Sequence, residues 1–218
     1  PEEEAQVVEV LRSRWVGQGP KVAEFERQLA QVLGVEHAVA VSSGTAALHV
    51  ALLTLGIGPG DAVLVPDFTF PASANAVRHC GAEPILLDID LDTLNLSLDG
   101  LARFLEQQTK TASGDLIDRP SGRIIKAIMA VHLFGLPLAM QLLMQLAGRY
   151  GLAIVEDAAC ALGARDHSGL CGTVAEVGCF SFHPRKLITT GEGGLLVTGR
   201  SEIAERARSL RNHGMSRT

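Results

Sequence analysis

Three short segments of the sequence carry side chains whose types and spacing could bind and react with a small ligand. The first is Ser42-Ser43-Gly44-Thr45, which joins a segment typical of a strand to one typical of a helix. Backbone N–H groups at the start of a helix point outward at the positive end of the helix dipole, which suits a phosphate group. Gly44 permits a close approach, and the hydroxyl groups can add hydrogen bonds. A serine that only caps the helix is the simpler alternative.

The second segment, 152–157, is an apolar strand that ends in two carboxylates, Glu156 and Asp157. A carboxylate in this place can face a cationic group of a ligand without being surrounded by water. The alternative is structural, because an aspartate can also cap the start of a helix in the Ala158-Ala159 segment that follows.

The third segment, 179–186, is an apolar strand followed closely by Lys186. A lysine in this place can be partly desolvated, which favours the neutral, nucleophilic amine. Ser181 alternates with two phenylalanines and therefore faces the opposite side of the strand, and His183 precedes the lysine by three residues. Taken singly, Lys186 could be an ordinary loop lysine and His183 an ordinary structural histidine.

Together the three segments match the requirements of one cofactor. Pyridoxal phosphate needs an anion site for its phosphate, a carboxylate that keeps its ring nitrogen protonated, an apolar surface against its ring and an amine that reacts with its aldehyde. The chain offers each of these groups, so the combination predicts a pyridoxal phosphate site.

The elements that must position these groups alternate between short apolar runs and helical periodicity. Expected strands cover 37–41, 62–65, 84–88, 124–131, 152–155, 179–182 and 194–198. Expected helices cover 20–33, 44–55, 71–80, 97–105, 138–149 and a final one from Ser201. Such alternation predicts a mostly parallel sheet with helices on both faces, and ligands bind beyond the carboxyl ends of its strands. The polar stretch 109–122 has no apolar period and is expected to be a loop or insertion.

Composition excludes several classes of protein. The chain has 218 residues, 47% hydrophobic and 20% charged, which allows a large buried core. Its net charge is −5 and no Lys/Arg cluster suggests nucleic-acid binding. No apolar run reaches the roughly 18 residues of a membrane span, and the acidic start is unlike a signal peptide. The 4 cysteines lack CxxC or zinc spacing, so we expect free thiols, no metal site and a reducing cytoplasm.

Across nearly its whole length the sequence resembles the DegT/DnrJ type of sugar-nucleotide aminotransferases, which are fold-type I pyridoxal phosphate enzymes. The blocks that carry the resemblance are 17–26 (GQGPKVAEFE), 41–49 (VSSGTAALH), 56–61 (GIGPGD), 69–70 (TF), 131–135 (VHLFG), 156–159 (EDAA), 180–194 (FSFHPRKLITTGEGG) and 211–214 (RNHG). So many blocks in one order are highly specific.

The resemblance implies a three-layer α/β/α fold over 1–218, the large domain of fold-type I pyridoxal-phosphate-dependent transferases. Residues 1–19 would form an N-terminal arm, and 201–218 would begin the helix that leads toward a small C-terminal domain missing from this chain. It also implies a cytoplasmic homodimer whose active sites take residues from both subunits.

For the site, the resemblance implies roles residue by residue. The cofactor phosphate would be bound by Gly44, Thr45 and Ser181, and its ring would stack on Phe70. Asp157 would pair with the ring nitrogen. Lys186 would form the Schiff base and then move the proton, while His183 would lie beside the substrate or the lysine.

The reaction implied is amino transfer from an amino acid, usually glutamate, to a keto-sugar nucleotide. One departure concerns Cys160, since the family usually has a glutamine there that contacts the ring hydroxyl, and a thiol is a weaker hydrogen-bond partner. The alternatives are a cofactor-binding module without catalysis and a sugar dehydratase of the same family. The dehydratases replace the lysine with histidine, so Lys186 disfavours that reading. A cysteine desulfurase would need a mobile catalytic cysteine further along the chain, and the His-x-x-Lys sequence that ends at Lys186 is not the one expected for that enzyme.

Overall fold

Apolar side chains occupy both faces of the central strands, and this determines where the helices pack. Along β2 (Asp61–Pro66), Val63 and Val65 face one core, whereas Ala62 and Leu64 face another. These side chains are fully buried. Successive side chains of a strand point to opposite faces of a sheet, so a strand that is apolar throughout requires cover on both sides.

The computed structural model describes residues 2–110 and 114–215. Its main strands are β1 (His37–Val41), β2, β3 (Glu83–Leu87), β6 (Ile124–Val131), β7 (Ala153–Asp157), β10 (Val177–Ser181) and β11 (Gly194–Thr198). They form one sheet in the order β1-β11-β10-β7-β6-β2-β3. β11 is antiparallel to both of its neighbours, and the other pairs along this path are parallel. The predicted mostly parallel sheet is therefore confirmed.

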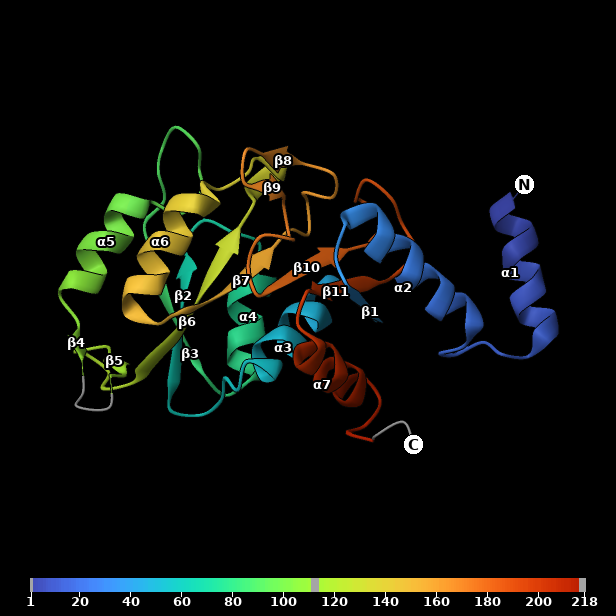
Figure 1. The fold of residues 1–218 in the computed structure, drawn as a ribbon, viewed down its shortest axis with the longest axis horizontal. Coiled ribbons are helices and arrows are strands. Elements are labelled where there is room, and N and C mark those ends of the chain that lie inside the picture. Colours follow the sequence, from blue (N-terminus) through green and yellow to red (C-terminus); the bar gives the residue numbers. More distant parts are fainter. Residues whose placement is uncertain (1, 111–113, 216–218) are drawn as a thin grey trace.

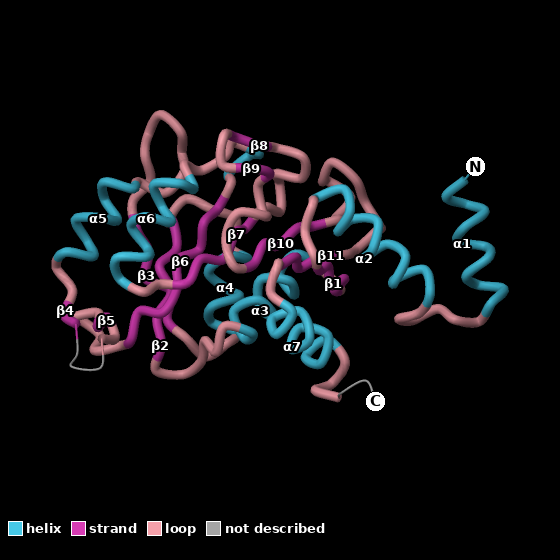
Figure 2. The backbone as a smooth tube through the Cα atoms, viewed as in Figure 1, coloured by secondary structure: helices cyan, strands magenta, loops and turns pink. Residues whose placement is uncertain are grey.

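Helices cover both faces of this sheet (Figures 1 and 2). One face carries α3 (Gly44–Thr54), α4 (Ala72–His79) and α7 (Ser201–Arg211). The other carries α2 (Pro20–Leu33), α5 (Leu98–Glu106) and α6 (Met140–Tyr150). The predicted three-layer α/β/α architecture is confirmed, and most boundaries agree with the expected ranges within two or three residues.

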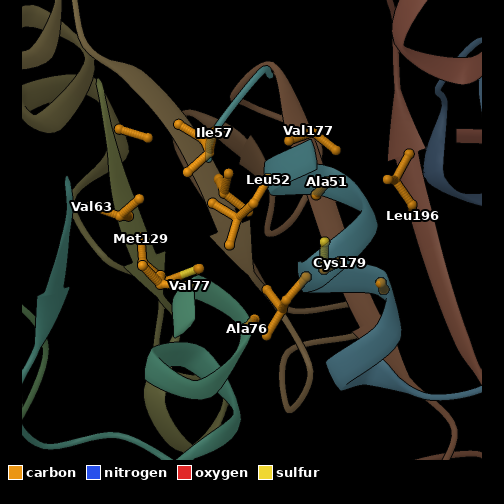
Figure 3. Packing of buried hydrophobic residues seen from close by; sticks show 14 of the residues in the cluster. Ala51, Leu52, Ile57, Val63, Ala76, Val77, Met129, Val177, Cys179 and Leu196 are labelled. Carbon is orange, nitrogen blue, oxygen red and sulfur yellow. The ribbon is translucent and has the colours of Figure 1, made fainter. Parts of the chain in front are cut away.

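The core beneath α3 and α4 is built from small and branched side chains. Figure 3 shows Leu52 of α3 and Ala76 of α4 close to side chains of the sheet, among them Cys179. Alanines on these helices allow a close approach to the strands, and the buried members of this cluster are almost inaccessible to solvent. Close packing of this kind holds the N-terminus of α3 at a fixed place on the sheet edge.

Helix ends follow the signals in the sequence. The Ser43 side chain accepts a hydrogen bond from Ala46 N at 3.1 Å, and the Ser97 side chain accepts one from Gly100 N at 3.1 Å. Gly34 ends α2 with a φ of 67°, which glycine adopts without the steric cost of a Cβ atom. Ser43 is thus a helix cap, as the simpler alternative held, and it also places Gly44 and Thr45 in the first turn of α3.

Some elements escaped sequence analysis. Helix α1 (Glu2–Ser13) has no buried residue and lies apart from the sheet in Figure 1. A short hairpin joins β8 (Arg165–Asp166) to β9 (Gly169–Leu170), and a 3-10 turn spans Leu133–Gly135. Within the described ranges, no helix combines the length and apolar character needed to cross a membrane.

The expectation of a loop or insertion at 109–122 is wrong in part. Strands β4 (Thr109–Lys110) and β5 (Leu116–Ile117) form an antiparallel pair, and β5 also pairs with β6. Two-residue strands are too short for an apolar period, which explains the error. Residues 111–113, within the same stretch, lie outside the described residues.

Candidate functional site

The carboxyl ends of β1, β2, β6, β7 and β10 meet at one edge of the sheet because these strands run in the same direction. A cavity of about 490 Å³ opens at this edge. It is lined by all the residues that the sequence singles out for the site: Gly44, Thr45, Phe70, Asp157, Cys160, Ser181, His183 and Lys186. The fold therefore brings together groups from the three chemistry-bearing segments.

One wall of the cavity is the N-terminus of α3. The N–H groups of Gly44 and Thr45 precede the first intrahelical hydrogen bond, so the helix itself provides no acceptor for them. A Cβ atom added to Gly44 would lie 2.8 Å from Ser181 Cβ and 3.3 Å from Ser181 Oγ. Only glycine fits at this position. The N–H groups of Gly44 and Thr45 and the Ser181 hydroxyl therefore lie near one another, and such a group of donors suits an anion.

The floor of the cavity holds a buried carboxylate. Asp157, the last residue of β7, is 6% exposed. Its Oδ2 accepts a hydrogen bond from Ser73 Oγ at 2.7 Å, and its Oδ1 accepts one from Ala159 N at 3.2 Å. Burial raises the pKa of Asp157, while the hydrogen bonds from Ser73 and Ala159 and the nearby Lys186 oppose that rise. No helix begins at Ala158, so the helix-cap alternative for this aspartate is wrong.

The neighbouring carboxylate points to the other side of β7. Glu156 is fully buried and accepts hydrogen bonds from the backbone N–H groups of Gly172, Val174 and Ala175. It also pairs with His132, whose Nε2 lies 2.9 Å from Glu156 Oε2. Leu138 N donates to His132 Nδ1, so Nε2 carries the hydrogen in this arrangement. Glu156 therefore fixes the loops behind the sheet, which leaves Asp157 to face the cavity.

A turn after β10 presents the amine. Lys186 N donates to His183 O at 2.9 Å, and Arg185 N donates to His183 Nδ1 at 3.2 Å. His183 thus shapes the turn that carries Lys186, and its Nε2 lies 3.9 Å from Glu192 Oε1. Lys186 Nζ reaches across to Cys160 Sγ at 3.0 Å. The amine and the thiol come from different segments and meet in the same cavity.

The mouth of the cavity is apolar and open. Phe70 is 71% exposed, and Phe134 in the 3-10 turn is 76% exposed; both line the cavity. Phe68, which also lines the cavity, is exposed as well. A flat ring inside the cavity would find an aromatic surface here.

Two polar residues at the site escaped sequence analysis. Ser73 is fully buried in the first turn of α4, and Thr69 Oγ1 lies 3.0 Å from Ser73 Oγ. The available signal was the position of Ser73 on the same helix face as Ala76 and Val77, which are buried. A serine on a buried face needs a hydrogen-bond partner, although the sequence does not name it.

No cluster of three or more His, Cys, Asp or Glu side chains able to hold a metal ion occurs in 2–110 and 114–215. The 4 cysteines are free, and only Cys160 is exposed.

Comparison with known proteins places these features in context. The sequence profile of the DegT/DnrJ/EryC1/StrS aminotransferase family matches residues 1–218. The chain is 40% identical over 210 residues to the GDP-perosamine synthase of Caulobacter vibrioides, covering 96% of this chain and 52% of that protein. It is 39% identical over 216 residues to the spore coat polysaccharide biosynthesis protein SpsC of Bacillus subtilis, covering 99% and 51%.

Solved structures of related aminotransferases share the fold of this chain. A DegT DnrJ EryC1 StrS aminotransferase from Brucella abortus superimposes with a TM-score of 0.89 at 39% identity, over 99% of this chain and 56% of that one. DesV of S. venezuelae, in complex with a ketimine intermediate, superimposes with a TM-score of 0.83 at 38% identity, over 99% and 55%. The chain thus spans about half the length of the curated relatives it matches.

Proposed function

The chain belongs to the DegT/DnrJ/EryC1/StrS aminotransferase family, and on that premise we propose that it takes part in the transfer of an amino group from glutamate to a keto-sugar nucleotide. Pyridoxal phosphate is the cofactor of this family. The name of one relative, GDP-perosamine synthase, supports a sugar nucleotide as the acceptor. Glutamate as the donor is proposed from the family resemblance alone.

The cavity fits this cofactor in its set of polar groups and in the aromatic side chain of Phe70 on its wall. The contact between Gly44 and Ser181 leaves no room for a side chain at residue 44, so the Ser181 hydroxyl lies beside the first turn of α3. The buried carboxylate of Asp157 suits a cationic ring nitrogen, and the amine of Lys186 suits an aldehyde. These groups lie around one cavity, and their presence together is the observation that carries the proposal.

Each residue then has a role. Gly44 and Thr45 bind the phosphate through their backbone N–H groups, and the Ser181 hydroxyl donates a further hydrogen bond. Phe70 covers the ring, and Asp157 holds a proton on the ring nitrogen. When bound, pyridoxal phosphate supplies an aldehyde for amine exchange and a ring that accepts electrons.

Lys186 Nζ would hold the aldehyde and, once the substrate amine has displaced it, would move a proton from the substrate carbon to the cofactor carbon. The amine must be neutral to do so, and the turn held by His183 keeps it in the cavity. His183 is thus proposed to orient the lysine and to lie beside the substrate. Cys160 lines the same cavity and lies beside Lys186 Nζ. We propose that its thiol contacts the cofactor ring.

The assembly is proposed to be a cytoplasmic homodimer. The exposed aromatic side chains around the cavity mouth support this, since Phe70 and Phe134 remain uncovered in a single chain. A second copy placed over this rim would enclose the cavity and exclude water. We also propose that 1–218 is the large domain, with 1–19 as an arm and 201–218 leading toward a C-terminal domain.

A single-turnover assay tests the proposed function. Cofactor-loaded protein mixed with glutamate in the absence of an acceptor is expected to release 2-oxoglutarate in an amount equal to the loaded sites. A keto-sugar nucleotide added afterwards is then expected to gain an amino group, detected by mass. Lys186→Ala serves as the inactive control. Release of no 2-oxoglutarate by protein that has bound its cofactor would contradict the proposal and favour a non-catalytic binding module.

A further inference from the structure

The carboxylate of Asp157 depends on a hydroxyl that lies far from it in the sequence. Ser73 Oγ donates to Asp157 Oδ2 at 2.7 Å across 84 residues of sequence, and Thr69 Oγ1 lies 3.0 Å behind it. Ser73 is fully buried, so water does not replace this contact. The remaining partner of the carboxylate is the Ala159 N–H, at the longer distance of 3.2 Å.

We propose that Thr69 and Ser73 are positioning residues that form a hydroxyl relay, which keeps Asp157 ionised and fixes its orientation toward the cofactor ring nitrogen. The role of Asp157 toward the ring rests on the proposed function. The relay itself concerns groups that are present in the cofactor-free chain.

The direction of the relay depends on the charge of Asp157. A hydroxyl has one hydrogen to donate, and an ionised carboxylate can only accept. When Asp157 is ionised, Ser73 must donate to it, and Thr69 must therefore donate to Ser73. A protonated Asp157 has no need of the Ser73 hydrogen and could donate to Ser73 instead. The hydrogen bonds from Thr69 to Ser73 and from Ser73 to Asp157 therefore stabilise the ionised carboxylate of Asp157, and they do so most strongly when both hydroxyl groups are present.

Burial makes this support necessary. Taking a carboxylate out of water favours its neutral form, and burial raises the pKa of Asp157. The hydrogen bond from Ser73 is the largest of the effects that lower it. The ionisable groups that face Asp157 are Lys186 from the turn after β10 and His132 from the end of β6, with Cys179 on the neighbouring strand. A neutral Asp157 could not hold a proton on the ring nitrogen.

The relay also ties Asp157 to the wall of the cavity. Ser73 N donates to Phe70 O at 3.1 Å, so the segment that carries Phe70 and Thr69 is joined to the first turn of α4. One short segment therefore supplies both the aromatic surface for the ring and the hydrogen bond to the carboxylate beneath it. A shift of this segment would move both groups together.

The relay can be tested without cofactor by following the carboxyl ¹³C resonance of Asp157 in aspartate-labelled protein as the pH is changed, with Asp157→Asn to assign the signal. Ser73→Ala is expected to raise the pKa of Asp157, and Thr69→Val to raise it less, because the direct donor remains. Thr54→Val is the matched control, since Thr54 is also a buried hydroxyl but donates to Ala51 O within α3. An unchanged Asp157 titration in Ser73→Ala would overturn the relay, as would an equal shift in Thr54→Val.

A second measurement connects the relay to the cofactor. Ser73→Ala is expected to raise the dissociation constant for pyridoxal phosphate by about tenfold, the effect of one hydrogen bond to a charged group. Unchanged affinity together with a raised Asp157 pKa would overturn the claim that the relay serves the ring nitrogen. Failure of the parent protein to bind cofactor would count against the proposed function, while the cofactor-free titration would still decide the relay. Thr69→Val provides the same test if Ser73→Ala does not fold.

Discussion

Lys186 Nζ lies 3.0 Å from Cys160 Sγ, so the amine proposed to bind the cofactor ends beside a thiol from a separate segment. Cys160 follows the end of β7, and Lys186 follows the end of β10, which is the neighbouring parallel strand. The parallel pairing therefore explains how residues 26 apart come into contact. It also makes the thiol a reporter on the state of the cavity.

Iodoacetamide is expected to modify Cys160 before the other cysteines. Cys160 is exposed, whereas Cys80, Cys171 and Cys179 are buried, and burial raises the pKa of Cys80 to about 11 and raises that of Cys179 as well. Reactivity requires the thiolate, so the buried thiols react slowly. Peptide mass mapping at short times measures the preference. Bound pyridoxal phosphate is expected to protect Cys160, and labelling unaffected by the cofactor would place the cofactor elsewhere.

Asp157→Asn is expected to weaken binding of pyridoxal phosphate by tenfold or more. An amide cannot provide the negative charge that pairs with a protonated ring nitrogen, and a charged hydrogen bond contributes about 1.5–3 kcal/mol. Spectrophotometric titration gives the dissociation constant. Asp99→Asn, an exposed aspartate at the start of α5, serves as the control. Equal affinity in the Asp157 and Asp99 variants would show that another group pairs with the ring.

The same substitution is expected to stabilise the cofactor-free protein at neutral pH. Because burial raises the pKa of Asp157 above its unfolded value near 3.8, the folded chain holds this proton more tightly than the unfolded chain. The free energy of unfolding therefore falls as the pH rises through the interval between the two pKa values.

Asp157→Asn removes this loss of stability. We therefore expect its Tm at pH 7 to exceed that of the parent, and the difference to shrink as the pH falls below the unfolded pKa. Thermal denaturation followed by circular dichroism at a series of pH values measures the difference. A Tm at or below that of the parent at neutral pH would mean that the hydrogen bonds from Ser73 and Ala159 outweigh the cost of burial.

Gly44→Ala is expected to destabilise the protein by about 1–3 kcal/mol and to weaken cofactor binding. The new Cβ would lie 2.8 Å from Ser181 Cβ, so α3 or β10 must move, although alanine usually favours a helix over glycine. Gly58→Ala is the matched control, because a Cβ atom there would have no neighbour within 4 Å. Chemical denaturation and a cofactor titration measure the two effects. A Gly44 variant as stable as the Gly58 variant would contradict the close contact with Ser181.

The sequence predicts the layers of the fold well because the elements are long and their apolar patterns are strong. The prediction fails where an element is too short, or too exposed, to show an apolar period. Strands β4 and β5 contain two residues each, which is too few for an alternation. Helix α1 has no buried face, so its apolar residues gave no useful period.

The site was predictable to a similar extent. Lys186 and Asp157 stand at the ends of apolar strands, and the sheet rule places such ends together. Alternation along β7 shows that Glu156 and Asp157 face opposite ways, but only the packing decides which of them reaches the cavity. Ser73 could not be paired with Asp157 from the sequence, since their contact joins residues 84 positions apart.

The most direct test of the central claim is reductive trapping of the cofactor on Lys186. The protein is incubated with pyridoxal phosphate, reduced with borohydride and measured by intact mass and peptide mapping. Lys186→Ala is treated in the same way. Lys21→Ala is the control, because Lys21 of α2 forms an ion pair with Glu9 of α1. We predict one cofactor adduct in the parent and in Lys21→Ala, located on the peptide that contains residue 186, and none in Lys186→Ala. An adduct of equal yield in Lys186→Ala would contradict the assignment of this lysine and of the cavity around it.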